Sequence, residues 1–87
     1  MPRYVSLHTL ACLTRQGAGQ LSERLFGSTR VKTLRVRVNM LEGKMLVEFD
    51  AGDRESLEEW LKQEGFHYDW LMRIEWESDS GPLAAVP

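Results

Sequence analysis

Cysteine, proline and long apolar runs are all scarce in this chain of 87 residues. Cys12 is the only cysteine, so an intramolecular disulfide and a zinc site built from several cysteines are both excluded. No apolar stretch approaches the ~20 residues that a membrane-spanning helix needs. Arg3 and His8 interrupt the apolar residues at the start of the chain, which is not typical of a signal peptide. We therefore expect a soluble, cytoplasmic protein with no membrane partner.

The chain is also short for a protein that lacks disulfides. A single hydrophobic core of this size is only marginally sufficient for stability. Association between identical copies is a common way to add buried surface to such a small domain. We therefore expect a homo-oligomer, most simply a dimer.

The charge is nearly balanced overall but unevenly distributed. The formal net charge is −2, yet residues 1–44 carry eight Lys and Arg against two Asp and Glu, and residues 45–87 carry three against eleven. Such a division can neutralise itself across one sheet, which is the interpretation we favour. The balance does not provide a nucleic-acid-binding field, and RNA-recognition sheets need exposed aromatic residues, of which Tyr4 would be the only one. No nucleic-acid partner is expected.

Alternation of apolar and polar residues predicts four strands. The pair Glu42-Gly43 is typical of a tight turn and predicts a hairpin between the second and third strands. The strands are expected over residues 4–10, 33–41, 44–50 and 70–77.

Two helices are predicted between these strands. Thr14 is a suitable N-cap for a helix that ends near residue 26, and Asp53 is a suitable N-cap for a second helix. Gly65 is expected to adopt the left-handed conformation that ends the second helix, with Phe66 folding back on its last turn. Residues 78–87 show no periodicity and are expected to be a disordered tail after a single domain over residues 1–77.

This order of elements, βαββαβ, predicts an α+β domain of the ferredoxin-like type. Right-handed crossovers give a four-stranded antiparallel sheet in the order 4-1-3-2, with both helices on one face. The other face of the sheet is then open to solvent or to a partner.

Alternation also assigns each side chain of a strand to one of these two faces. Leu34, Val36 and Val38, together with Leu57, Trp60 and Ile74, are expected to be buried beneath the helices. We assign Val5, Leu7, Trp70 and Met72 to this helix-covered face and Tyr4, Ser6, His8, Leu71 and Arg73 to the open face.

A ligand site is predicted on the open face. A histidine beside a carboxylate suits proton transfer, and arginines nearby would favour a small anion, because guanidinium groups match carboxylate and phosphate. The alternative is a solvated surface whose arginines merely neutralise Glu48 and Glu75. The residues of this predicted site are Ser6, His8, Arg35, Arg37, Glu48 and Arg73.

Two further groups of residues carry side chains suited to chemistry. His67, Tyr68 and Asp69 precede the last strand in a loop, where they suit packing of the sheet end. His8 and Cys12, with His67 or Asp69, offer nitrogen and sulfur donors, but their spacing matches no metal-binding motif. No metal and no cofactor are expected.

Three segments carry a resemblance to a known family. They are Met1-Pro2-Arg3-Tyr4-Val5, Val47-Glu48-Phe49-Asp50-Ala51 and the stretch from Glu58 through Gly65 to the last predicted strand. Together they resemble a family of small uncharacterised bacterial proteins that includes a nickel-binding protein built from ferredoxin-like units. The chain has Leu34-Arg35-Val36 where that family often has Trp-Val-His, so its metal binding is not carried over. The resemblance implies paired sheets in an α+β barrel, as in small dimeric monooxygenases and muconolactone isomerases.

Two hypotheses for function follow. The first is a non-enzymatic binding or structural domain that self-associates through its open sheet face. The alternative is a cofactor-free enzyme of the dimeric α+β barrel type, isomerase-like or monooxygenase-like, acting on a small anionic substrate. The enzyme requires a cavity between the sheet and its partner that contains His8, whereas the binding domain requires only that His8 be paired or solvated.

Overall fold

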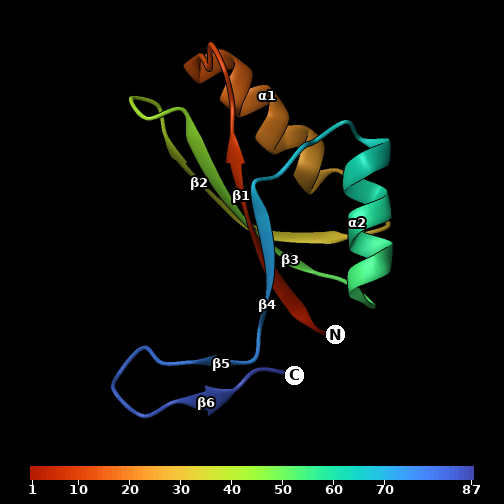
Figure 1. Ribbon diagram of the computed structural model, residues 1–87, viewed down its shortest axis with the longest axis vertical. Helices are drawn as coiled ribbons and strands as arrows, with labels where there is room; N and C mark the ends of the chain where they lie inside the picture. The colour runs from red at the N-terminus through yellow and green to blue at the C-terminus, as the bar shows by residue number, and fades with distance from the viewer.

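The computed structural model describes residues 1–87, and Figure 1 shows their arrangement as a sheet with two helices and a separate hairpin. Neither helix is long and apolar enough to cross a membrane. The elements in chain order are β1 (Arg3–Thr9), α1 (Arg15–Phe26), β2 (Lys32–Asn39), β3 (Lys44–Asp50), α2 (Arg54–Gln63), β4 (Trp70–Ile74), β5 (Trp76–Glu77) and β6 (Ala84–Ala85).

The first four strands form one antiparallel sheet in the order β2-β3-β1-β4. This is the predicted order, and the α+β class is confirmed. Both helices lie on the same side of the sheet (Figure 1). The other side is the open face, and β2 and β4 are its two edges.

The ends of both helices follow from local sequence. The hydroxyl of Thr14 accepts a hydrogen bond of 2.9 Å from the backbone N–H of Gly17, which caps α1. The carboxylate of Asp53 accepts one of 2.7 Å from the N–H of Ser56, which caps α2. Both predicted N-caps are therefore confirmed.

The end of α2 is the predicted Schellman motif. Gly65 has φ +67°, and its N–H donates to the carbonyl of Lys62 at 3.1 Å. The N–H of Phe66 donates to the carbonyl of Leu61 at 2.9 Å, and the ring of Phe66 is buried. This turn therefore delivers an aromatic ring to the core immediately after the helix.

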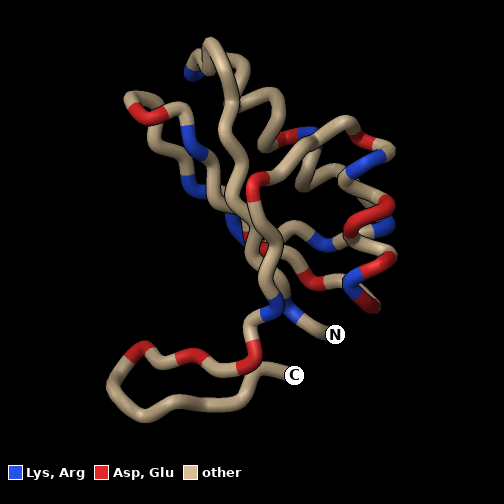
Figure 2. Tube along the Cα trace, viewed as in Figure 1, with Lys and Arg blue, Asp and Glu red and all other residues tan.

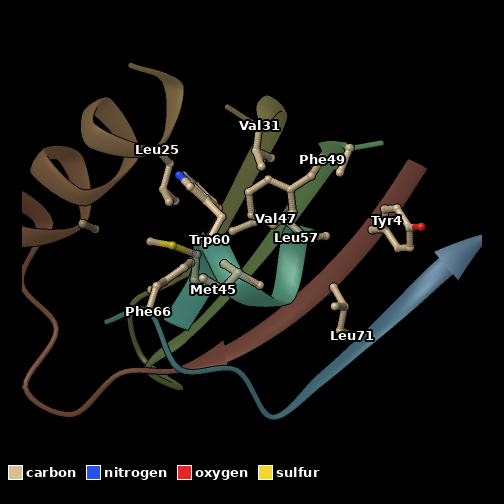
Figure 3. Close-up of a cluster of buried hydrophobic side chains, with 13 residues drawn as sticks. Tyr4, Leu25, Val31, Met45, Val47, Phe49, Leu57, Trp60, Phe66 and Leu71 are labelled. Carbon is tan, nitrogen blue, oxygen red and sulfur yellow. The ribbon is translucent and has the colours of Figure 1, made fainter. Parts of the chain in front are cut away.

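The core lies between the helices and the sheet (Figure 3). Phe49 of β3 meets Trp60 of α2 edge to face, with ring centroids 5.7 Å apart. Burial of Leu57 and Trp60 is confirmed, whereas Val38 on the edge strand β2 is 41% exposed. The half-buried Leu34, Val36 and Ile74 also belong to the edge strands, which neighbours cover on one flank only.

The assignment of β1 to the two faces was wrong. Ser6 lies opposite Val47 and His8 lies opposite Met45, and residues directly opposite in an antiparallel pair share a face. Because Val47 and Met45 are core residues, Ser6 and His8 are buried beneath the helices together with Tyr4. The physical reason is that both polar side chains find hydrogen-bond partners there, as described below.

The assignment of β4 was wrong in the same way. Leu71 lies opposite Ser6 and is buried in the core, whereas Met72 lies opposite Val5 on the open face. Trp70 likewise lies opposite Leu7 on the open face. The reversal of β4 follows from that of β1, because neighbouring strands share their faces in register.

The structure confirms the helix-covered face for Val36 and Val38 and the open face for Arg35, Arg37 and Glu48. A register shift occurs between Thr33 and Arg35, so that Leu34 is an extra residue in β2. Beyond this bulge, Val36 lies opposite Val47 on the helix-covered face and Arg35 lies opposite Glu48 on the open face. The bulge was not predicted.

The predicted last strand and tail form two units instead. β4 ends at Ile74, and β5 pairs with β6, which lies in the tail where no regular structure was expected. Gly81, at φ +125°, lies in the connecting turn, and its N–H donates to the hydroxyl of Ser78 at 2.8 Å. Residues 75–87, called the arm below, extend away from the sheet on the side opposite α2 (Figure 1).

Candidate functional site

The open face carries a patch of apolar side chains. Trp70 and Met72 of the edge strand β4 are 43% and 53% exposed on this face. Contiguous exposed apolar surface of this kind is typical of an interaction site. This open-face patch consists of Leu7, Leu46, Trp70, Met72 and Ile74, together with Val5, which lies on the same face but is itself buried.

The patch was missed from the sequence because its residues were assigned to the core. Alternation in β4 placed Trp70, Met72 and Ile74 correctly on one face, but the wrong face was chosen for the core. The sequence of β4 carries no signal for the correct face, because Trp70, Met72 and Ile74 outnumber Leu71, the one large apolar side chain on the buried face.

Basic side chains line the edge of the open face along β2. The guanidinium of Arg37 donates a hydrogen bond of 3.1 Å to Glu48 on β3, which forms an ion pair across the strands. Arg35 also lies opposite Glu48 but forms no ion pair, and neither does Lys32. We call Lys32, Arg35 and Arg37 the basic edge.

The six residues predicted to form a ligand site are divided between the two faces of the sheet. The backbone of the sheet separates the two groups, so they do not form one cluster. Arg35, Arg37 and Glu48 share the open face, whereas Ser6 and His8 lie beneath the helices and Arg73 is opposite the buried Tyr4.

His8 occupies a fully enclosed position in the core. Its Nδ1 lies 2.8 Å from the carbonyl oxygen of His67, and its Nε2 lies 2.6 Å from the hydroxyl of Ser6. Its ring stacks on Phe66 with centroids 3.7 Å apart. The aromatic ring delivered by the end of α2 therefore covers one face of the imidazole.

These contacts determine the protonation of His8. A carbonyl oxygen only accepts hydrogen bonds, so Nδ1 carries the proton and Nε2 accepts one from the hydroxyl of Ser6. Burial lowers the pKa of His8 below its ordinary value of 6.5, and this outweighs the opposing effects of the His67 carbonyl and of Asp69. His8 is therefore a neutral imidazole with both nitrogens engaged, which favours a structural role.

The loop before β4 is fastened to the end of the sheet by a polar cluster. The N–H of Asp69 donates to the carbonyl of Leu7 at 2.7 Å, and the hydroxyl of Thr9 donates to the Asp69 carboxylate. The ammonium of Lys44 donates in turn to the Thr9 hydroxyl at 2.7 Å. This agrees with the structural interpretation of the loop and explains how the His67 carbonyl is held against His8.

The residues considered as metal ligands are not brought together. Cys12 is exposed in the turn after β1, at φ +53°, whereas His8 is enclosed in the core. No group of three or more His, Cys, Asp or Glu side chains is placed to hold a metal ion.

The open face contains only a shallow depression. Leu7 and Leu46 line it together with Arg37 and Lys44, and its volume is about 200 Å³. Small-molecule pockets usually enclose about 300–1,000 Å³. The shape of this face therefore suits a flat protein surface better than an enclosed ligand.

Comparison of the chain with protein-family models, with curated proteins and with solved structures finds no match. The resemblance to the family that includes a nickel-binding protein therefore stays a prediction.

Proposed function

We propose that this chain is a ferredoxin-like binding domain whose activity is self-association, with two copies packing their open faces against each other. The observation that carries the proposal is the exposure of Trp70 and Met72 on a face that no helix covers. Burial of apolar surface contributes about 25 cal/mol per Å², which would supplement a small core.

The charges of the two edges support a second copy as the partner. The basic edge lies along β2, and acidic residues follow β4 at the other edge (Figure 2). In a dimer with two-fold symmetry the same surface serves both copies, so it must be complementary to itself. The open face is apolar along β1 and β4 and basic along β2, and the acidic residues that follow β4 can reach the basic edge of a second copy, which meets that requirement.

The placement of His8 favours this proposal over a cofactor-free enzyme. The enzyme hypothesis required His8 in a cavity between the sheet and its partner. His8 instead lies on the helix-covered face, paired to Ser6 and to the backbone of His67. Of the residues expected to bind a small anion, Arg35, Arg37 and Glu48 remain on the face that a partner would cover.

Light scattering coupled to size exclusion tests the proposal. We expect twice the chain mass of 10.0 kDa at high micromolar concentration. Met72→Glu should raise the dissociation constant about tenfold or more, because it places a charge in the buried patch. Leu41→Glu is the matched control, because Leu41 is 97% exposed in the β2–β3 turn, outside the patch.

Two results would overturn the proposal. The first is a wild-type mass of 10.0 kDa at high micromolar concentration. The second is equal association of the Met72→Glu and Leu41→Glu variants, which would show that the open-face patch is not the contact surface. Circular dichroism of each variant verifies that the fold is retained.

A further inference from the structure

We infer that the arm of each copy lies along the basic edge of the other copy. This inference rests on the proposed self-association and adds which segments meet across the dimer. The arm is residues 75–87, and the basic edge is Lys32, Arg35 and Arg37 of β2, as defined above.

Most of the arm is exposed in its own copy, where Val86 alone is buried. Its strands β5 and β6 contain two residues each, and an isolated two-stranded hairpin is marginally stable in water. One ion pair of 3.2 Å, between Arg3 and Glu77, links the arm to the sheet, and the backbone hydrogen bond from Val86 to Glu75 lies within the arm. Trp76 is 59% exposed within this hairpin. A second chain would give this apolar surface a partner that its own chain does not provide.

All the charged residues of the arm are acidic. It contains Glu75, Glu77 and Asp79 and no Lys or Arg (Figure 2). Glu77 pairs with Arg3 of its own copy, but Glu75 and Asp79 form no ion pair. Two exposed carboxylates are therefore available for contact with another chain.

The basic edge offers the complementary charges. Arg37 is neutralised by Glu48, whereas Lys32 and Arg35 form no ion pair. The edge strand β2 also presents backbone N–H and C=O groups that no neighbouring strand satisfies. Two free cations beside an unpaired strand edge suit an acidic extended segment.

The strand order prevents these two regions from meeting within one copy. The arm follows β4, and β1 and β3 separate β4 from β2, a distance of about 14 Å between strand axes. A two-fold axis parallel to the strands, between two facing sheets, places the β4 edge of each copy against the β2 edge of the other. The arm already extends from the body on the side opposite α2 (Figure 1), where a second sheet would lie.

Charge-reversed variants test this contact. The arm variant is Glu75→Lys/Asp79→Lys, and the edge variant is Lys32→Glu/Arg35→Glu; all four side chains are exposed. Each variant alone should associate about tenfold more weakly than wild type, because like charges then face each other in both contacts of the dimer. A 1:1 mixture should regain association, because opposite charges face each other again in both contacts of the mixed dimer.

Matched controls reverse the same charges on the helices. Glu23→Lys/Glu59→Lys serves for the arm variant, and Arg15→Glu/Lys62→Glu serves for the edge variant. Mixing these two control variants should leave association as it is for each of them alone. Raised salt should shrink the difference between the arm variant and wild type, because the contact is made by exposed charges.

The outcomes separate the two proposals. If the mixture of arm and edge variants associates no better than either alone, the arm does not meet the basic edge. Self-association through the open face is then tested separately, by the comparison of Met72→Glu with Leu41→Glu. If the wild-type chain is a monomer, both proposals fail.

Discussion

Two polar pairs, Ser6–His8 and Arg37–Glu48, lie on opposite faces of the sheet and differ in their access to water. Ser6 and His8 are fully buried beneath the helices, where the His67 carbonyl completes their hydrogen bonds. Arg37 and Glu48 lie on the open face, with the Arg37 side chain 52% exposed. The first pair therefore has no alternative to its protein partners, whereas the second exchanges freely with solvent.

The comparison shows that polarity alone does not tell which face of a strand is buried. Burial of a neutral polar pair costs little when every donor and acceptor is satisfied. Once Ser6 and His8 are satisfied in the core, Val5 and Leu7 take the open face and create an apolar patch there. The polar pair inside and the apolar patch outside are two consequences of one register.

Replacement of His8 is expected to have the largest effect on stability. His8→Ala removes a ring stacked on Phe66 and leaves the Ser6 hydroxyl and the His67 carbonyl without their partner. We expect the free energy of unfolding to fall by about 2–4 kcal/mol, measured by urea denaturation. His67→Ala is the control, because that side chain is exposed and should cost less than about 0.5 kcal/mol. Equal losses in the two variants would contradict the buried position of His8.

Removal of the Ser6 hydroxyl should have the next largest effect. Ser6→Ala leaves the Nε2 acceptor of His8 buried without a donor, at a cost of about 1–3 kcal/mol. Ser80→Ala, in the exposed turn of the arm, should change the free energy of unfolding by less than about 0.5 kcal/mol. A neutral Ser6→Ala would indicate that water or another group reaches His8.

Stability should also depend on pH through His8. Its pKa is lowered in the folded state by burial, so the unfolded chain takes up a proton at higher pH than the folded chain. Neutral His8 contributes fully to the free energy of unfolding above pH 6.5, the ordinary pKa of histidine. This free energy decreases as the pH falls from there to the lowered pKa of His8 in the folded state. The slope is at most about 1.4 kcal/mol per pH unit.

Urea denaturation across this pH range measures the slope. His8→Gln should abolish it, and His67→Gln should retain it. The lowered pKa of Asp53, caused by its hydrogen bonds to Ser56, affects stability only below about pH 3.8 and does not overlap. A slope that persists in His8→Gln would assign the effect to another group.

The exposed pair should have the smallest effect. A double-mutant cycle on Arg37→Ala and Glu48→Ala should give a coupling energy of about 0.2–1 kcal/mol, decreasing with added salt. The equivalent cycle on Ser6→Ala and His8→Ala should give a larger value that salt does not change. A coupling between Arg37 and Glu48 above that range would mean that the open face is shielded from water, as it would be in a dimer.

Local sequence predicted the parts of the fold that local hydrogen bonds stabilise. Thr14 and Asp53 cap the helices through side-chain bonds to residues three positions along the chain. Gly65 ends α2 because a residue without Cβ adopts positive φ at no steric cost. The strand order followed from the order of elements and the handedness of crossovers, and neither depends on which face is buried.

The candidate site could not be predicted in the same way. On β1, Tyr4, Ser6 and His8 point to one face of the sheet, and Val5 and Leu7 point to the other. Apolarity alone favours the second set for the core. Three of the six predicted site residues, Arg35, Arg37 and Glu48, were placed correctly because β2 and β3 alternate without ambiguity.

The sequence by itself determined the helices, their caps, the hairpin of β2 and β3, and the strand order, because each depends on backbone preferences within a short segment or on chain topology. Only the tertiary structure decided which face of β1 and β4 is buried, because the hydrogen bond that makes His8 acceptable in the core comes from His67, 59 residues away. It also decided the arm, because the pairing of β5 with β6 requires the chain to leave the sheet after Ile74. Contacts between distant segments are not encoded in the alternation of a single strand.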